Sequence, residues 1–174
     1  SFKPDENVQA KTADGGNTTI TGDFLSITLV PSVPFSDEGT PMIERRLLDR
    51  GVLKTYYGNV RFSRYIGTEP TGYYRSIRVD AGSTSVEEMK KQPYLQVVNF
   101  SDFQMDDFTG HFGGEIRLAF LFDGEKVTPV TGGSVNGSII DTQASMLLSK
   151  ETQVEDGYEG PLAVCFDNIP VAGE

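Results

Sequence analysis

The chain contains one histidine, His111, and one cysteine, Cys165, and these side chains are the first candidates for catalysis or zinc binding. His111 lies in the segment Thr109-Gly110-His111-Phe112-Gly113-Gly114, where it could act as a base or as a metal ligand. No serine or cysteine lies in a nucleophile motif that would pair with this imidazole. The favoured interpretation of His111 is therefore an exposed polar residue at the start of a strand, with catalysis as the weaker alternative.

Cys165 lies inside a predicted strand, between Val164 and Phe166. Reactive cysteines occupy electropositive and partly open surroundings, which this segment does not predict. We expect Cys165 to be a small, packed and unreactive residue. Zinc sites use three or four nitrogen, sulfur or oxygen ligands, and one histidine with one cysteine is too few. The sequence thus predicts no metal site and no cofactor.

Three aspartates, Asp102, Asp106 and Asp107, create a local acidic density without the spacing of a calcium-binding EF-hand loop. A solvated acidic loop explains them better. The glycine pairs Gly113-Gly114 and Gly132-Gly133 are not followed by Lys-Ser or Lys-Thr, so no phosphate-binding loop is predicted.

The composition excludes several classes of function. Twenty-five acidic side chains against 15 basic ones give the 174-residue chain a formal charge of −10. Such a chain is poorly suited to bind nucleic acid or anionic lipid, which both need basic clusters. No apolar run approaches the roughly 20 residues that cross a bilayer. A single cysteine favours a reducing compartment, so we expect a cytoplasmic protein.

The elements that must position these residues begin after a polar segment, residues 1–23, which we expect to be a linker or an edge segment. Period-two alternation predicts strands over residues 25–29 and 75–80. Further strands are predicted over residues 94–100, 134–139 and 162–166. Hairpins are predicted around Asp49-Arg50-Gly51 and around Asp123-Gly124-Glu125.

Three helices are predicted from capping signals and helical spacing. The first covers residues 60–66, between an Asn59 cap and Gly67. The second starts from a capping box at Ser85 and runs to about Gln92. The third covers residues 140–149. We therefore predict a β-rich α+β domain over residues 24–174, with mostly antiparallel sheets, sandwich-like or barrel-like, and two or three short helices.

Six segments, in order, resemble motifs of the TldD/PmbA proteins, a metallopeptidase family also called modulators of DNA gyrase. FSDEGTP at residues 35–41 resembles F-D-D-E-G-x-P, and LLDRGVLK at 47–54 resembles L-I-E-N-G-V-L-K. The other four segments are RYIGTEPTG at 64–72, DAGSTSVEE at 80–88, TGHF with FDGEKVTPV at 109–112 and 122–130, and FDNIPVAG at 166–173. The resemblance covers residues 24–173 and implies the β-rich C-terminal domain of a family member.

The resemblance also implies which type of member this is. TldD-type members bind zinc through a His-Glu-x-x-x-His helix that precedes this domain and through a late cysteine. This sequence has no His-Glu pair, and residues 155–161, where that cysteine would fall, read EDGYEGP. Cys165 lies beyond that point and is not carried over as the ligand. The chain therefore resembles the zinc-free PmbA/TldE-type partner.

Two functions remain open. The first is a domain that shapes a proteolytic chamber, forms a homo- or hetero-oligomer with a TldD-like subunit, binds extended peptides and is inactive alone. The second is a stand-alone β-rich binding or structural module with no peptidase role.

Overall fold

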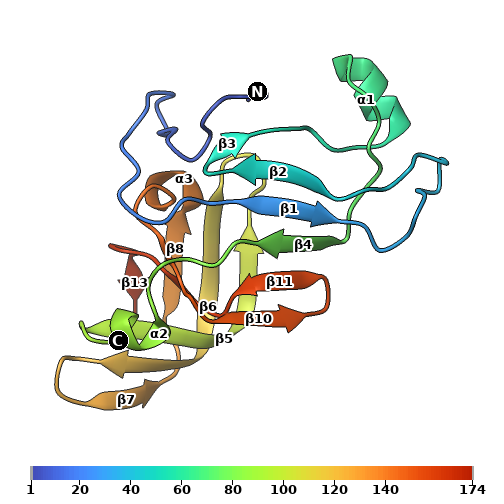
Figure 1. The fold of residues 1–174 in the computed structure, drawn as a ribbon. Coiled ribbons are helices and arrows are strands. Elements are labelled where there is room, and N and C mark those ends of the chain that lie inside the picture. The colour runs from blue at the N-terminus through green and yellow to red at the C-terminus, as the bar shows by residue number, and fades with distance from the viewer. Residues whose placement is uncertain (1, 174) are drawn as a thin grey trace.

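Four short strands from the first half of the chain and a hairpin from near its end build a six-stranded sheet (Figure 1). The computed structural model describes residues 2–173. The sheet order is β10-β11-β4-β1-β2-β3, and only the β11–β4 pair is parallel. Its strands are β1 (Ile27–Val30), β2 (Arg45–Asp49), β3 (Val52–Leu53), β4 (Ser76–Val79), β10 (Thr152–Glu155) and β11 (Tyr158–Pro161).

A second sheet contains the long strands and carries the main apolar cluster. Its order is β13-β8-β6-β5, with β7 also paired to β6. The strands are β5 (Tyr94–Met105), β6 (His111–Phe122), β7 (Val127–Val130), β8 (Ser134–Ser138) and β13 (Val171–Ala172). Ile116, Ala119 and Val135 are buried together on it. In Figure 1, β6 and β8 run at a steep angle to β1 and β4.

The strands β9 (Leu147–Leu148) and β12 (Val164–Cys165) form a separate two-stranded antiparallel sheet. The predicted β-rich α+β class is therefore confirmed, and no sheet of the described residues closes into a barrel. None of the helices within residues 2–173 is long and apolar enough to cross a membrane.

Two of the described helices begin where their capping residues predict. In α1 (Val60–Ile66) the Asn59 side chain accepts from the Phe62 amide, and Gly67 ends the helix at φ +74°. In α2 (Val86–Met89) the Ser85 hydroxyl accepts from the Glu88 amide. A side-chain oxygen at this position satisfies an amide that has no partner inside the helix.

Two predicted helix lengths are wrong. The segment 140–149 forms only one helical turn, α3 (Ile139–Thr142), and then leaves the helix so that β9 can pair with β12. The helix α2 ends at Met89 rather than near Gln92. Tertiary pairing outweighs local helical spacing in the first case.

The N-terminal segment lies against the folded chain. Asn7 forms a β-bridge with Val52, and the side chain of Gln9 is fully buried. The Asp5 amide also donates to the carbonyl of Leu53 at 2.7 Å.

Candidate functional site

The pairing of β5, β6 and β8 aligns polar side chains in rows on one face of the second sheet. Residues that lie opposite one another in neighbouring strands project from the same face. The two rows are Asp102–Glu115–Ser134 and Gln104–Gly113–Asn136.

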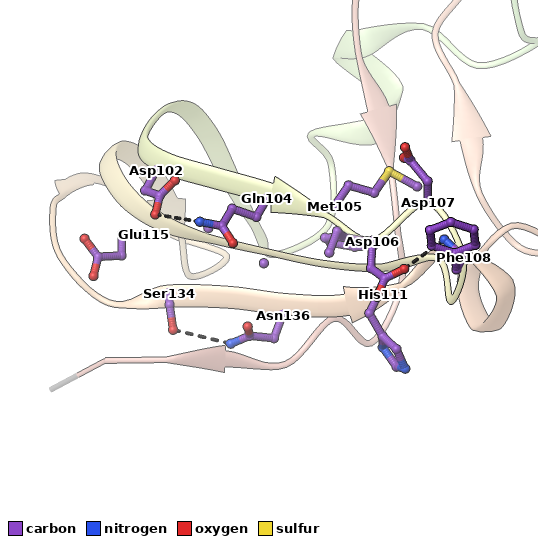
Figure 2. A pocket seen from close by; sticks show the side chains of 13 residues that line it. Asp102, Gln104, Met105, Asp106, Asp107, Phe108, His111, Glu115, Ser134 and Asn136 are labelled. Atoms are coloured by element: carbon purple, nitrogen blue, oxygen red, sulfur yellow. Dashed lines mark hydrogen bonds between the residues drawn. The ribbon is translucent and has the colours of Figure 1, made fainter.

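These rows form the floor of an open hollow of about 810 Å³ (Figure 2). Four carboxylates line it, from Asp102, Asp106, Asp107 and Glu115, and no lysine or arginine does. The Gln104 amide donates to the Asp102 carboxylate at 3.4 Å, as Figure 2 shows. The arrangement suits a cationic or hydrogen-bonding ligand better than an anion.

The hairpin turn beside the hollow is held by the Asp106 carboxylate. This group accepts from the amides of Phe108 at 2.8 Å and Thr109 at 3.0 Å. The backbone closes the turn, since the Asp106 amide donates to the His111 carbonyl and the Gly110 amide to the Asp106 carbonyl. The Thr109 and Phe108 amides hold the pKa of Asp106 below its usual value.

His111 begins β6 with an exposed side chain and lines both the hollow and a smaller one of about 470 Å³. The smaller hollow also contains Asp141 and Asn168. Within residues 2–173 the imidazole makes no hydrogen bond, so no hydroxyl or thiol is hydrogen-bonded to it. Among the described residues, no hydrogen bond therefore joins His111 to a potential nucleophile.

Cys165 lies on β12, is half-buried and lines neither hollow. Burial, with the nearby Asp167 carboxylate, raises the pKa of its thiol, which keeps it protonated. The described residues contain no group of three or more side chains arranged to hold a metal ion. One exposed histidine and one half-buried cysteine do not supply the three or four ligands that a zinc ion needs.

The glycines of the sheet floor have a packing role. A Cβ on Gly114 would lie 2.7 Å from the Phe100 ring and 2.9 Å from the Asp102 carbonyl oxygen. A Cβ on Gly113 would lie 2.7 Å from Oδ1 of Asn136. Glycine allows this close approach, and the pair lies inside β6 rather than in a phosphate loop.

The structure brings together some of the side chains that the sequence singled out. His111 and the three aspartates share the hollow, although Asp102 lies in β5 rather than in a loop. Gln104, Glu115, Ser134 and Asn136 were not predicted from the sequence. Polar residues at every second position, 102 and 104 in one strand and 134 and 136 in another, are the signal that could have identified them.

A sequence model of one family, the PmbA/TldA metallopeptidase C-terminal domain, matches residues 10–173. The chain belongs to this family. The TldD/PmbA resemblance of the six sequence segments is thus confirmed.

Among curated PmbA/TldA relatives, the metalloprotease TldD homolog of Buchnera aphidicola is 26% identical over 160 residues. The alignment covers 80% of this chain but 32% of the relative, so the chain spans about a third of that protein's length.

Solved structures share the fold of this PmbA/TldA domain. A Bacteroides thetaiotaomicron protein described as a modulator of DNA gyrase aligns over 95% of this chain and 40% of its own, with TM-score 0.75 and 22% identity. TldE from Thermococcus kodakarensis aligns over 97% of this chain and 47% of its own, with TM-score 0.75 and 18% identity. A Thermotoga maritima protein, described as a modulator of a DNA gyrase, aligns over 95% of this chain and 43% of its own, with TM-score 0.73 and 21% identity. At these identities the likeness concerns the fold alone.

Proposed function

We propose that the chain is the C-terminal domain of a zinc-free, PmbA/TldE-type peptidase subunit. In this role it forms part of the wall of a proteolytic chamber and binds a TldD-like subunit and extended peptides. The single observation that carries the proposal is the family match over residues 10–173, in a chain whose described residues contain no zinc-ligand set.

The region that would hold the late cysteine of a TldD-type member supports the zinc-free assignment. Residues 155–161 form the turn and second strand of the β10–β11 hairpin, and they contain no cysteine. The Gly157 turn at φ +77° packs near the Arg75 carbonyl, where a Cβ would come within 2.7 Å of that oxygen. The segment thus has a structural role in this chain.

The free edge of β5 and the acidic hollow beside it support peptide binding. Strand β5 ends the sheet order, so the outward backbone groups of Tyr94–Met105 have no strand partner among the described residues. An extended peptide satisfies such groups by adding a strand, while pockets next to the edge select its side chains.

A hydrolysis assay tests the proposal. We expect the purified chain to cleave no unstructured peptide, with or without zinc, and His111→Ala to change nothing. Addition of a zinc-bearing TldD-type subunit is expected to give co-elution and chelator-sensitive hydrolysis.

Two outcomes would contradict the proposal. Chelator-sensitive cleavage by the chain alone that His111→Ala abolishes would make this domain catalytic. Failure to co-elute with any TldD-type subunit, without gain of activity, would favour the stand-alone β-rich module.

A further inference from the structure

The larger and the smaller hollow on the second sheet adjoin one another. They share His111, Phe112 and Asn136 as lining residues. In Figure 2, Asp102 and Glu115 lie at one end of the larger hollow and His111 lies at the other, where the smaller hollow begins. Together the two hollows form one acidic trough along β6 and β8.

The carboxylates of the acidic trough have no counter-charges. Five of them line it, and no lysine or arginine does: Asp102, Asp106, Asp107, Glu115 and Asp141. None of the five forms an ion pair among residues 2–173. Carboxylates gathered on a concave surface raise the local concentration of cations. The trough therefore favours a positively charged ligand.

Ser138 is a nearly buried side chain whose hydroxyl has no partner among the described residues. It is 8% exposed and lines the smaller hollow. Although Ser138 directly precedes α3, its hydroxyl caps no helix amide, and the Thr142 hydroxyl donates to the Ser138 carbonyl instead. Every fully buried side-chain nitrogen or oxygen within residues 2–173 has a partner, so this hydroxyl must reach the hollow. Leaving it unpaired is unfavourable, and a ligand group in the hollow would supply the partner.

The strand register places Ser138 and Glu115 on the same face at a fixed separation. Ser138 lies opposite His111, and Ser134 lies opposite Glu115. Residues 134, 136 and 138 project from one face, because side chains alternate along a strand. Four residues of strand span about 13 Å. Ligand groups that reach both ends of the trough are therefore separated like residues i and i+4 of an extended peptide.

The spread of the carboxylates favours a long cation over a metal ion. The described residues contain no group of three or more side chains that could hold a metal. A metal ion concentrates its charge at one point, with ligands about 2–2.6 Å away. An extended peptide distributes its charges, and its side chains alternate with the same period as those of the strands below it.

We propose that the acidic trough selects extended peptides with lysine or arginine at positions i and i+4. One basic side chain lies between Asp102 and Glu115. The other donates to the Ser138 hydroxyl and faces the Asp141 carboxylate. This inference rests on the peptide binding proposed above and names the class of peptide that is bound.

Fluorescence anisotropy of labelled peptides with the purified chain tests the spacing. The first probe is a short threonine-rich peptide with lysines at i and i+4. The matched probe has the same composition with lysines at i and i+3, which project from opposite faces of an extended chain. We expect the matched probe, and a probe with norleucine in place of both lysines, to bind at least about tenfold more weakly. Added salt should weaken binding of the first probe.

Variants of the chain test the two ends of the trough. Glu115→Gln and Ser138→Ala are each expected to weaken binding of the i, i+4 probe at least about threefold. Glu155→Gln is the matched control, because Glu155 is an exposed carboxylate on β10 outside the trough. It should leave binding unchanged. Ser138→Ala should keep the wild-type melting temperature, since its hydroxyl makes no hydrogen bond in the fold.

Four results would overturn the inference. Equal binding of the two lysine probes would refute the spacing, and equal binding of the norleucine probe would refute the selection of charge. Competition by spermidine at the affinity of the peptide would indicate a site for small polyamines. Binding that neither Glu115→Gln nor Ser138→Ala weakens would place the peptide elsewhere.

The proposed function is decided separately from this selectivity. Peptide binding without preference for lysine, together with co-elution with a TldD-type subunit, refutes the inference and leaves the proposed function intact. Absence of any peptide binding also refutes the inference, and the co-elution and hydrolysis assays then decide the proposed function by themselves.

Discussion

Gln9 and Gln143 hold the N-terminal segment to the end of α3 through hydrogen bonds in both directions. The Gln9 amide donates to the Gln143 carbonyl at 2.9 Å and to the Asp23 carbonyl at 2.8 Å. The Gln143 amide donates to the carbonyls of Val8 and Lys11 at 3.1 and 3.3 Å. Together these bonds connect residues more than 130 positions apart in the sequence.

Gln9→Ala is expected to destabilise the fold by about 2–5 kcal/mol, because it leaves buried polar groups unpaired and creates a cavity. Gln9 is 0% exposed, and its Oε1 also accepts from the Leu25 amide at 2.8 Å. Urea denaturation measures the effect. Gln104→Ala is the matched control, since Gln104 is exposed and should change stability by less than about 0.5 kcal/mol. If both substitutions lower the free energy of unfolding equally, the buried hydrogen bonds of Gln9 add no more stability than an exposed glutamine does.

Gly51 is expected to tolerate no side chain. Its φ is +80°, and a Cβ would lie 2.8 Å from both Cβ and Oε1 of Gln9. Gly51→Val should therefore cost more than the roughly 1–3 kcal/mol of backbone strain alone. Gly132 has a similar φ of +81° with nothing within 4 Å of its Cβ position. Both Gly51→Ala and Gly132→Ala strain the backbone, but only Gly51→Ala also places a Cβ against Gln9. Gly51→Ala should therefore lower the melting temperature more, and equal decreases would rule out a steric contribution.

Local signals predicted the elements whose geometry is set by neighbouring residues. Gly51 and Asp123-Gly124 marked two hairpins, and Asn59 and Ser85 marked the starts of two helices. These features depend on a few adjacent backbone groups, which the sequence specifies directly.

Features set by distant partners were not predicted. Strand β9 and the burial of Gln9 depend on contacts with segments far along the chain. The β10–β11 hairpin was missed although Asp156-Gly157 is a turn signal, because Thr152–Glu155 has only one large apolar residue, Val154. The polar face of β5, β6 and β8 likewise depends on strand register. Register across long separations is specified by the whole fold.

Asp106 is expected to stabilise the β5–β6 turn in a pH-dependent way. The Thr109 and Phe108 amides lower its folded-state pKa. Its contribution is thus present above the unfolded-state pKa of about 3.9 and is lost as the pH falls through the lower folded-state pKa. Asp106→Ala should lower the melting temperature at pH 7. It should have little effect below the folded-state pKa of Asp106, where the carboxyl group is protonated in both states.

Asp106→Asn is the matched control for the charge. Its side-chain oxygen can still accept both amide hydrogen bonds, so it should keep more of the stability without the acid dependence. If the melting temperature of Asp106→Ala lies below that of the wild type by the same amount from neutral to strongly acidic pH, this account is contradicted.

Cys165 is expected to react slowly with thiol reagents in the folded protein. Burial and the Asp167 carboxylate raise the pKa of its thiol, which lowers the fraction of reactive thiolate at neutral pH. Alkylation with iodoacetamide should accelerate strongly when urea unfolds the chain. Cys165→Ser should also leave the activity of a reconstituted complex within a few-fold. Labelling of the native chain as fast as that of the unfolded chain would contradict the prediction.

The zinc content of this PmbA/TldA domain most directly tests whether it is of the zinc-free type. The chain is dialysed against zinc and then against metal-free buffer, and metal is measured by elemental analysis. One exposed histidine and one half-buried cysteine are too few for a zinc shell, so we predict a content far below one zinc per chain. A content near one zinc per chain at sub-micromolar affinity, lost in His111→Ala or Cys165→Ser, would contradict the account.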